Sequence, residues 1–92
     1  MMVRDVTVVN RLGMHARAAA KFVHLAGRFQ SKILVTRQGR EMDGKSIMGL
    51  LLLAAARGTT VTIAADGADE QAAVDALAEL VETGFGEETC SA

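Results

Sequence analysis

The spacing of apolar residues switches repeatedly between a period of two and a period near 3.6, and this switching limits the folds open to the chain. Period two is typical of strands and period 3.6 of helices. Strands are expected at residues 3–9, 32–37, 40–42 and 60–65, and helices at residues 16–29, 47–54 and 70–83. Glycine-containing turns separate most of these segments. The predicted order is therefore β-α-β-β-α-β-α.

The ends of the predicted helices carry residues that are typical of helix caps. Ser46 directly precedes the second helix and Asp69 the third, and both residue types are favoured N-caps. Gly84 suits the position just after the third helix, where Phe85 can fold back on the last turn.

The apolar stripes of the helices and one apolar sheet face predict a two-layer α+β fold. Three helices would cover one face of a four-stranded antiparallel sheet. The third helix illustrates the pattern, with a buried stripe at Ala73, Val74, Leu77 and Val81. With 92 residues the chain is long enough for a single core, so one domain is expected over residues 1–92, with a frayed tail at 87–92.

Charge is divided unevenly between the two halves of the chain. Residues 1–46 carry nine Lys/Arg against three Asp/Glu, whereas residues 47–92 carry one against eight. The basic half can attract acidic partners although the net charge is only −1. Three phenylalanines are the only aromatic residues, and this scarcity together with the acidic second half argues against nucleic-acid binding.

Other composition features exclude several kinds of site. A single cysteine, Cys90, excludes an internal disulfide framework and a cysteine-rich zinc site. The sequence lacks GxSxG, HExxH, CxxC, GxGxxG and P-loop motifs, so a pocketed enzyme is disfavoured and no metal or cofactor is expected. The longest apolar run, residues 47–56, is too short to span a bilayer, which predicts a cytoplasmic protein without membrane insertion.

His15 lies where a glycine-containing loop meets the first predicted helix. The first N–H groups of a helix have no intrahelical partner, so an anion beside His15 would meet those of Ala16 and Arg17. The Arg17 guanidinium could also bond a phosphate oxygen. A neutral imidazole at such a site can accept a phosphoryl group and pass it on. His-x-Arg is by itself a weak pattern, and an exposed loop histidine is the alternative interpretation.

Two further surfaces each allow two interpretations. Lys21 and His24 continue the basic side of the first helix, which is either a solvated face or a partner-binding one. Ser46 is either an N-cap or a phosphorylation site at a helix N-terminus. The apolar residues after it belong either to the core or to an exposed docking patch: Ile47, Met48 and Leu51.

These motifs resemble the HPr family, the histidine-containing phosphocarriers of the bacterial phosphoenolpyruvate–sugar phosphotransferase system. The resemblance rests on Asn-Arg-Leu-Gly-Met-His-Ala-Arg at residues 10–17, Lys-Ser-Ile-Met-Gly at 45–49 and Glu-Thr-Gly-Phe-Gly at 82–86. It covers residues 2 to about 88 and implies an open-faced β-sandwich, with three helices over a four-stranded antiparallel sheet.

The resemblance also implies roles and partners. Enzyme I would phosphorylate His15 on Nδ1, Arg17 would steady the phosphoryl group, and enzyme IIA domains would receive it. In some bacteria an HPr kinase/phosphorylase modifies the serine that Ser46 matches. The implied partner-binding residues are Lys21, His24, Ile47, Met48 and Leu51. A monomeric carrier of a transient phosphohistidine, and not an enzyme, is expected.

Two other functions stay open from the sequence. The chain could be a regulatory interaction protein that acts through Ser46, although relatives that only regulate lack the active histidine. It could also serve the nitrogen-related branch of the phosphotransferase system. One departure from the family is Ala18, where the family usually has proline, and alanine permits but does not enforce the same backbone geometry. We expect a somewhat looser His15–Arg17 loop with its activity retained.

Overall fold

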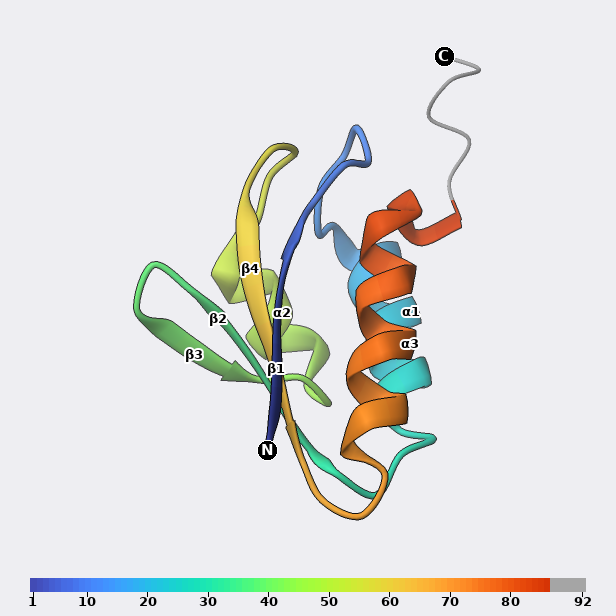
Figure 1. Ribbon diagram of the computed structural model, residues 1–92. Coiled ribbons are helices and arrows are strands. Elements are labelled where there is room, and N and C mark those ends of the chain that lie inside the picture. Colours follow the sequence, from blue (N-terminus) through green and yellow to red (C-terminus); the bar gives the residue numbers. More distant parts are fainter. Residues whose placement is uncertain (87–92) are drawn as a thin grey trace.

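The computed structural model describes residues 1–86 and confirms the predicted order of elements. The strands β1 (Met2–Thr7), β2 (Lys32–Arg37), β3 (Arg40–Asp43) and β4 (Thr60–Asp66) form one antiparallel sheet in the order β1-β4-β2-β3. The helices α1 (Ala16–Ala26), α2 (Ile47–Leu53) and α3 (Glu70–Glu82) cover one face of it, and a 3-10 turn, η1 (Gly84–Gly86), follows α3 (Figure 1). The fold is thus the expected open-faced β-sandwich. The tail expected at residues 87–92, with Cys90, lies outside the described residues.

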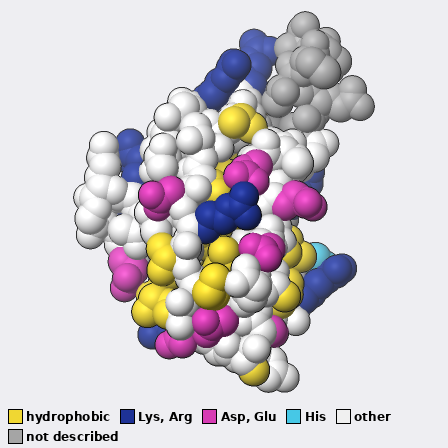
Figure 2. All heavy atoms as spheres, viewed as in Figure 1, with side chains coloured by type: hydrophobic (Ala, Val, Ile, Leu, Met, Phe, Trp, Pro, Cys, Tyr) yellow, Lys and Arg dark blue, Asp and Glu magenta, His cyan; other side chains and the backbone are white. Residues whose placement is uncertain are grey.

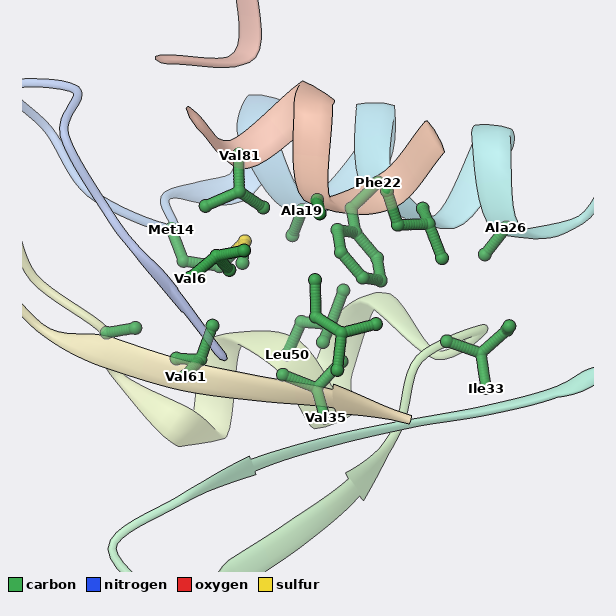
Figure 3. Packing of buried hydrophobic residues seen from close by; sticks show 14 of the residues in the cluster. Val6, Met14, Ala19, Phe22, Ala26, Ile33, Val35, Leu50, Val61 and Val81 are labelled. Carbon is green, nitrogen blue, oxygen red and sulfur yellow. The ribbon is translucent and has the colours of Figure 1, made fainter. Parts of the chain in front are cut away.

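The core lies between the sheet and the helices. Val61, Ile63 and Ala65 alternate inward along β4 as predicted, and each is at least 99% buried. Figure 3 shows Phe22 of α1 reaching toward Val35 and the neighbouring apolar side chains of the sheet. Complete burial of a side chain such as Phe22 contributes roughly 1.5–3 kcal/mol. This packing fixes α1 over the sheet and thereby fixes the loop at its N-terminal end.

The elements end at slightly different residues from those predicted. β1 spans residues 2–7, so it ends before Val8. Val8 is fully buried, but its backbone bonds to the segment that precedes β4: its N–H donates to Thr59 O, and its carbonyl oxygen accepts from Gly58 N. α1 ends at Ala26, three residues early, because Gly27 is a poor helix former and the backbone then tightens to i→i+3 bonds. α2 ends at Leu53 because Ala54 adopts a left-handed backbone with φ 52°. α3 ends at residue 82, β3 reaches residue 43 and β4 residue 66.

Of the two cap residues predicted for α3, Gly84 acts as expected and Asp69 does not. Gly84 follows the C-cap with φ +72°, and Phe85 is buried against the helix end, as predicted. Asp69 does hold the N-cap position, but its side chain makes no cap hydrogen bond, so its predicted capping role is wrong. Its carboxylate instead accepts hydrogen bonds from the Gln30 and Ser31 N–H groups and from the Ser31 hydroxyl, at 2.8, 3.0 and 2.5 Å.

These bonds tie the start of α3 to the segment that follows α1. The Ser31 hydroxyl bond, followed by the Gln30 N–H bond, lowers the pKa of the Asp69 carboxyl below its ordinary value of 3.8. A cap is a local interaction that sequence can suggest, whereas this contact joins residues 38 positions apart. The third helix is therefore anchored to the far end of α1 by a contact that periodicity does not reveal.

Charge follows the predicted division between elements. Figure 2 shows acidic side chains around a basic one on the face formed by β1 and α3. There Arg4 lies 3.2 Å from a Glu82 carboxylate oxygen and 3.8 Å from one of Asp75. The basic residues of α1 lie exposed as expected: Arg17, Lys21, His24 and, just beyond the helix, Arg28. The molecule therefore carries acidic and basic groups on different helices.

Candidate functional site: the His15 loop

Close backbone packing shapes the loop that carries His15. Gly13 has φ +66°, and a Cβ at this position would lie 2.6 Å from the Ala55 carbonyl oxygen and 2.9 Å from Ala56 Cα. Only glycine fits both the backbone conformation and the close approach. The next residue, Met14, donates its N–H to the same Ala55 oxygen at 2.9 Å and buries its side chain in the core. The loop thus rests on the segment between α2 and β4.

His15 is the N-cap residue of α1. Its backbone is extended, with φ −78° and ψ 177°, and its half-buried side chain makes no cap hydrogen bond to the helix. The first intrahelical bond runs from Ala19 N to His15 O at 2.8 Å, which leaves the N–H groups of Ala16, Arg17 and Ala18 without an intrahelical acceptor. The first turn of α1 contains no acidic residue to offset its positive end. The arrangement suits an anion held beside the imidazole.

Arg17 lies exposed in the first turn of α1, two residues from His15. Within residues 1–86 its guanidinium makes no hydrogen bond or ion pair. Ala18, next to it, is completely buried in the core and so holds the first turn of α1 in place. A guanidinium in this position can form charge-assisted bonds with a phosphoryl oxygen.

The other basic residues of α1 have different surroundings. The Lys21 ammonium donates to the Phe85 carbonyl oxygen at 2.8 Å and so holds the η1 turn against the helix. His24 lies exposed in the last turn of α1. The sequence predicted the exposure of both residues, but not the Lys21 contact, because its partner is 64 positions away.

Ser46 is the N-cap residue of α2, as one of the two interpretations predicted. Its Oγ accepts a hydrogen bond from the Gly49 N–H at 3.1 Å, and the residue is half-buried. Such a cap contributes about 1 kcal/mol. The cap hydrogen bond does not exclude phosphorylation of Ser46, so that second interpretation stays untested.

An apolar patch, which we call the α2 patch, consists of Ile47, Met48 and Leu52, with exposed fractions of 43, 66 and 51%. Leu51, expected with the first two, is half-buried and packs against the core. Leu52 was missed, although its spacing of four residues from Met48 places both on one side of a helix. Leu12, in the His15 loop, is also exposed and was not predicted.

The remaining question for residues 1–86 is whether they contain metal sites, membrane-spanning helices or hollows. No three His, Cys, Asp or Glu side chains are grouped so that they could hold a metal ion. None of the helices is long and apolar enough to cross a membrane. A hollow of about 160 Å³ lies at the open face of the sheet, lined among others by Leu34 and Ala64.

Comparison with known proteins adds a second line of evidence. The family model described as "PTS HPr component phosphorylation site" matches residues 2–83. The phosphocarrier protein HPr of Cupriavidus necator is 54% identical over 87 residues, which cover 95% of this chain and 98% of the relative.

Solved structures are similar over the same range. The crystal structure of an HPr from Thermoanaerobacter tengcongensis has a TM-score of 0.92 at 41% identity, covering 96% of this chain and 99% of that one. A crystal structure of Crh, a catabolite repression containing protein of Bacillus subtilis with a swapped, intertwined dimer, has a TM-score of 0.74 at 43% identity. It covers 91% of this chain and 97% of the other.

Proposed function

The chain belongs to the HPr family of phosphocarrier proteins of the phosphotransferase system, and from this premise we propose that it takes a phosphoryl group from phospho-enzyme I onto His15 and passes it to enzyme IIA domains in sugar uptake. The observation that carries the proposal is the position of His15 as the N-cap residue of α1, next to helix N–H groups without intrahelical acceptors. The exposed Arg17 guanidinium adds a second donor to the same place.

The transfer needs one nucleophilic nitrogen and a positive environment. His15 Nδ1 attacks the phosphorus, a P–N bond forms, and the bond between phosphorus and the donor breaks. The N–H groups of Ala16 and Arg17, with the Arg17 side chain, stabilise the negative charge on the phosphoryl oxygens. In a second displacement a nucleophile of the acceptor attacks the phosphorus, a bond to the acceptor forms, and the P–N bond to His15 breaks, so the chain itself ends unchanged as a carrier.

Docking is proposed to use the α2 patch and the basic side of α1. Ile47 and Met48 offer exposed apolar surface beside a charged helix, a combination found at interfaces with an apolar centre and a polar rim. Lys21 supplies positive charge that would guide acidic partner surfaces, and His24 lies exposed on the same helix. Because exposed charges are screened by salt, we expect partner association to slow as ionic strength rises.

A labelling experiment tests the proposal. Incubation with enzyme I and phosphate-labelled phosphoenolpyruvate should place an acid-labile phosphate on the chain. His15→Ala should abolish the label, while His24→Ala, at the only other histidine, should retain it. A wild-type chain that stays unlabelled while a known carrier is labelled in the same mixture would refute the proposal.

We further propose regulatory phosphorylation at Ser46, by an HPr kinase/phosphorylase where the organism has one. The supporting observation is that Ser46 caps α2 directly before the α2 patch, so a phosphate there would add charge beside the docking surface. The test is transfer of phosphate from ATP to Ser46 by a purified kinase, with Ser46→Ala as the control. Absence of modification under conditions that modify a known substrate would contradict this role.

The alternative functions have separate tests. Transfer from phosphorylated His15 to sugar-specific or to nitrogen-related enzyme IIA domains would decide between the two branches. A purely regulatory role would require no transfer at all. The monomeric state stays a prediction, which sedimentation can check against the swapped dimer of Crh. The cytoplasmic location expected from the sequence stays a prediction as well.

A further inference from the structure

We propose that Asn10 is a positioning residue for His15, because its side-chain amide holds the carbonyl group that also accepts the His15 backbone N–H. The inference rests on the proposed function of His15. Asn10 lies five residues before the histidine, after β1 has ended, and it is completely buried.

Three hydrogen bonds join Asn10, Gly13 and His15. Asn10 Nδ2 donates to Gly13 O at 2.7 Å, and the His15 N–H donates to the same oxygen at 2.9 Å. In addition, the Gly13 N–H donates to Asn10 O at 3.1 Å. A carbonyl oxygen has two lone pairs, and here the Asn10 amide and the His15 backbone use one each. The direction of the His15 N–H therefore depends on a carbonyl that the Asn10 side chain fixes.

The surroundings of Asn10 fix its own position. On one side the η1 turn approaches it closely: a Cβ at Gly84 would lie 3.5 Å from the Asn10 Cβ. A second contact supports the loop, because Met14 N bonds to Ala55 O. The Asn10 amide and the Met14–Ala55 contact thus hold the His15 loop at two separate points. Loss of the amide would leave the Gly13 carbonyl with only backbone partners.

Orientation matters because phosphoryl transfer needs the attacking nitrogen in line with the departing bond. Displacement of a reacting group by about 1 Å can lower a rate by roughly a hundredfold. Since Asn10 is fully buried, its side chain can touch neither the phosphoryl group nor a docked partner. We therefore expect an effect of its removal on the transfer rate, beyond loss of folded protein, to act through the loop that carries His15.

A matched control separates positioning from stability. Asn10 and Ser31 are the two buried polar residues of residues 1–86, and each lies in a segment next to α1. The Ser31 hydroxyl donates to Asp69 at the opposite end of the helix from His15. Truncation of either side chain to alanine removes a buried hydrogen-bonding group, so both variants should be destabilised. Only the Asn10 change lies at the His15 end.

The experiment measures phosphorylation by enzyme I for Asn10→Ala and Ser31→Ala, at a temperature where both variants are folded. We expect Asn10→Ala to lower kcat by about tenfold or more with KM within about twofold of wild type, because the docking surface is untouched. Both constants of Ser31→Ala should stay within about twofold of wild type. If the two variants have the same kcat, whether both reduced or both normal, the proposal is overturned.

Hydrogen exchange of the His15 amide gives a readout that does not depend on activity. Asn10→Ala should speed this exchange relative to Ser31→Ala by more than their difference in global stability explains, and equal exchange would overturn the proposal. If wild type takes no label on His15, the proposed function fails and the exchange comparison alone decides the positioning claim. If Asn10→Ala does not fold, Asn10→Ser, which leaves a smaller cavity, is judged by the same criteria.

Discussion

Replacement of Gly13 by alanine is the sharpest test of how the His15 loop is held. The new Cβ would lie 2.6 Å from the Ala55 carbonyl oxygen and 2.9 Å from Ala56 Cα, and both are backbone atoms. Neither can rotate away as a flexible side chain can. The two segments must therefore separate until the Cβ–oxygen distance reaches the range of ordinary contacts, which begins at 3.4 Å.

Two costs combine in this variant. A non-glycine residue in the left-handed region costs roughly 1–2 kcal/mol. Separation of the segments also stretches the Met14–Ala55 hydrogen bond, now 2.9 Å, and its loss adds about 1 kcal/mol. The total destabilisation is thus about 2–3 kcal/mol. For a domain of this size each kcal/mol lowers Tm by roughly 4–8 °C, so Gly13→Ala should lower it by at least about 8 °C.

Gly39→Ala is the matched control. Gly39 has φ +81°, so alanine incurs a similar backbone cost, but no atom lies within 4 Å of its added Cβ. Thermal unfolding should therefore show a drop in Tm for Gly13→Ala that exceeds the drop for Gly39→Ala by about 4–8 °C. Gly39 lies in the turn between β2 and β3, so its variant should keep the phosphotransfer rate.

The comparison has a clear negative outcome. If both variants lose the same stability, the contact with Ala55 and Ala56 does not restrict residue 13, and the loop is not held in the way described. If Gly13→Ala is less stable but transfers phosphate at the wild-type rate in its folded state, the loop conformation does not determine the reactivity of His15.

Three further predictions concern other parts of the molecule. Ser46→Asp keeps a capping side chain, so the free energy of unfolding should change by less than about 0.5 kcal/mol, while transfer to partners slows; an unchanged rate in the enzyme I assay contradicts the role of added charge. Because bonds to Ser31 and Gln30 depress the pKa of Asp69 below 3.8 in the folded state, their stabilisation is fully present above that value and is lost as the pH falls below it. In urea unfolding, the free energy of unfolding of wild type should therefore fall more than that of Asp69→Asn as the pH is lowered from about 5 to well below 3.8, and an equal fall would show that the carboxylate does not matter. Ala18→Pro should raise stability by about 0.4–1 kcal/mol, because the Ala18 N–H has no intrahelical acceptor, and should leave activity near wild type; a rise from no transfer to normal transfer would contradict an active wild-type chain.

Local sequence patterns predicted the fold and the position of His15 because each depends on neighbouring residues. The apolar period begins just after His15 and the glycine at 13 interrupts the chain, so the helix start could be located. The Ser46 cap was equally local. The partners of Lys21 and Asp69 lie 64 and 38 positions away, and no periodicity reports such contacts.

The burial of each α2 leucine was left open for a different reason. Its run of four leucines gives little contrast between buried and exposed faces, so a pattern of apolar residues cannot place each one. The structure buries Leu50 and Leu53, keeps Leu51 half-buried and exposes Leu52. Only packing against α1 and the sheet decides between them.

The contact between Gly13 and the Ala55–Ala56 backbone also bears on how the protein is made. Chains are synthesised from the N-terminus, so His15 leaves the ribosome long before the segment on which its loop rests. Contacts between distant residues form late because the intervening chain must first be ordered. A nascent chain that stops before residue 55 contains His15 but lacks the backbone segment against which its loop packs. The proposed competence for transfer is therefore acquired only after the Ala55–Ala56 segment has been made, well after His15 itself.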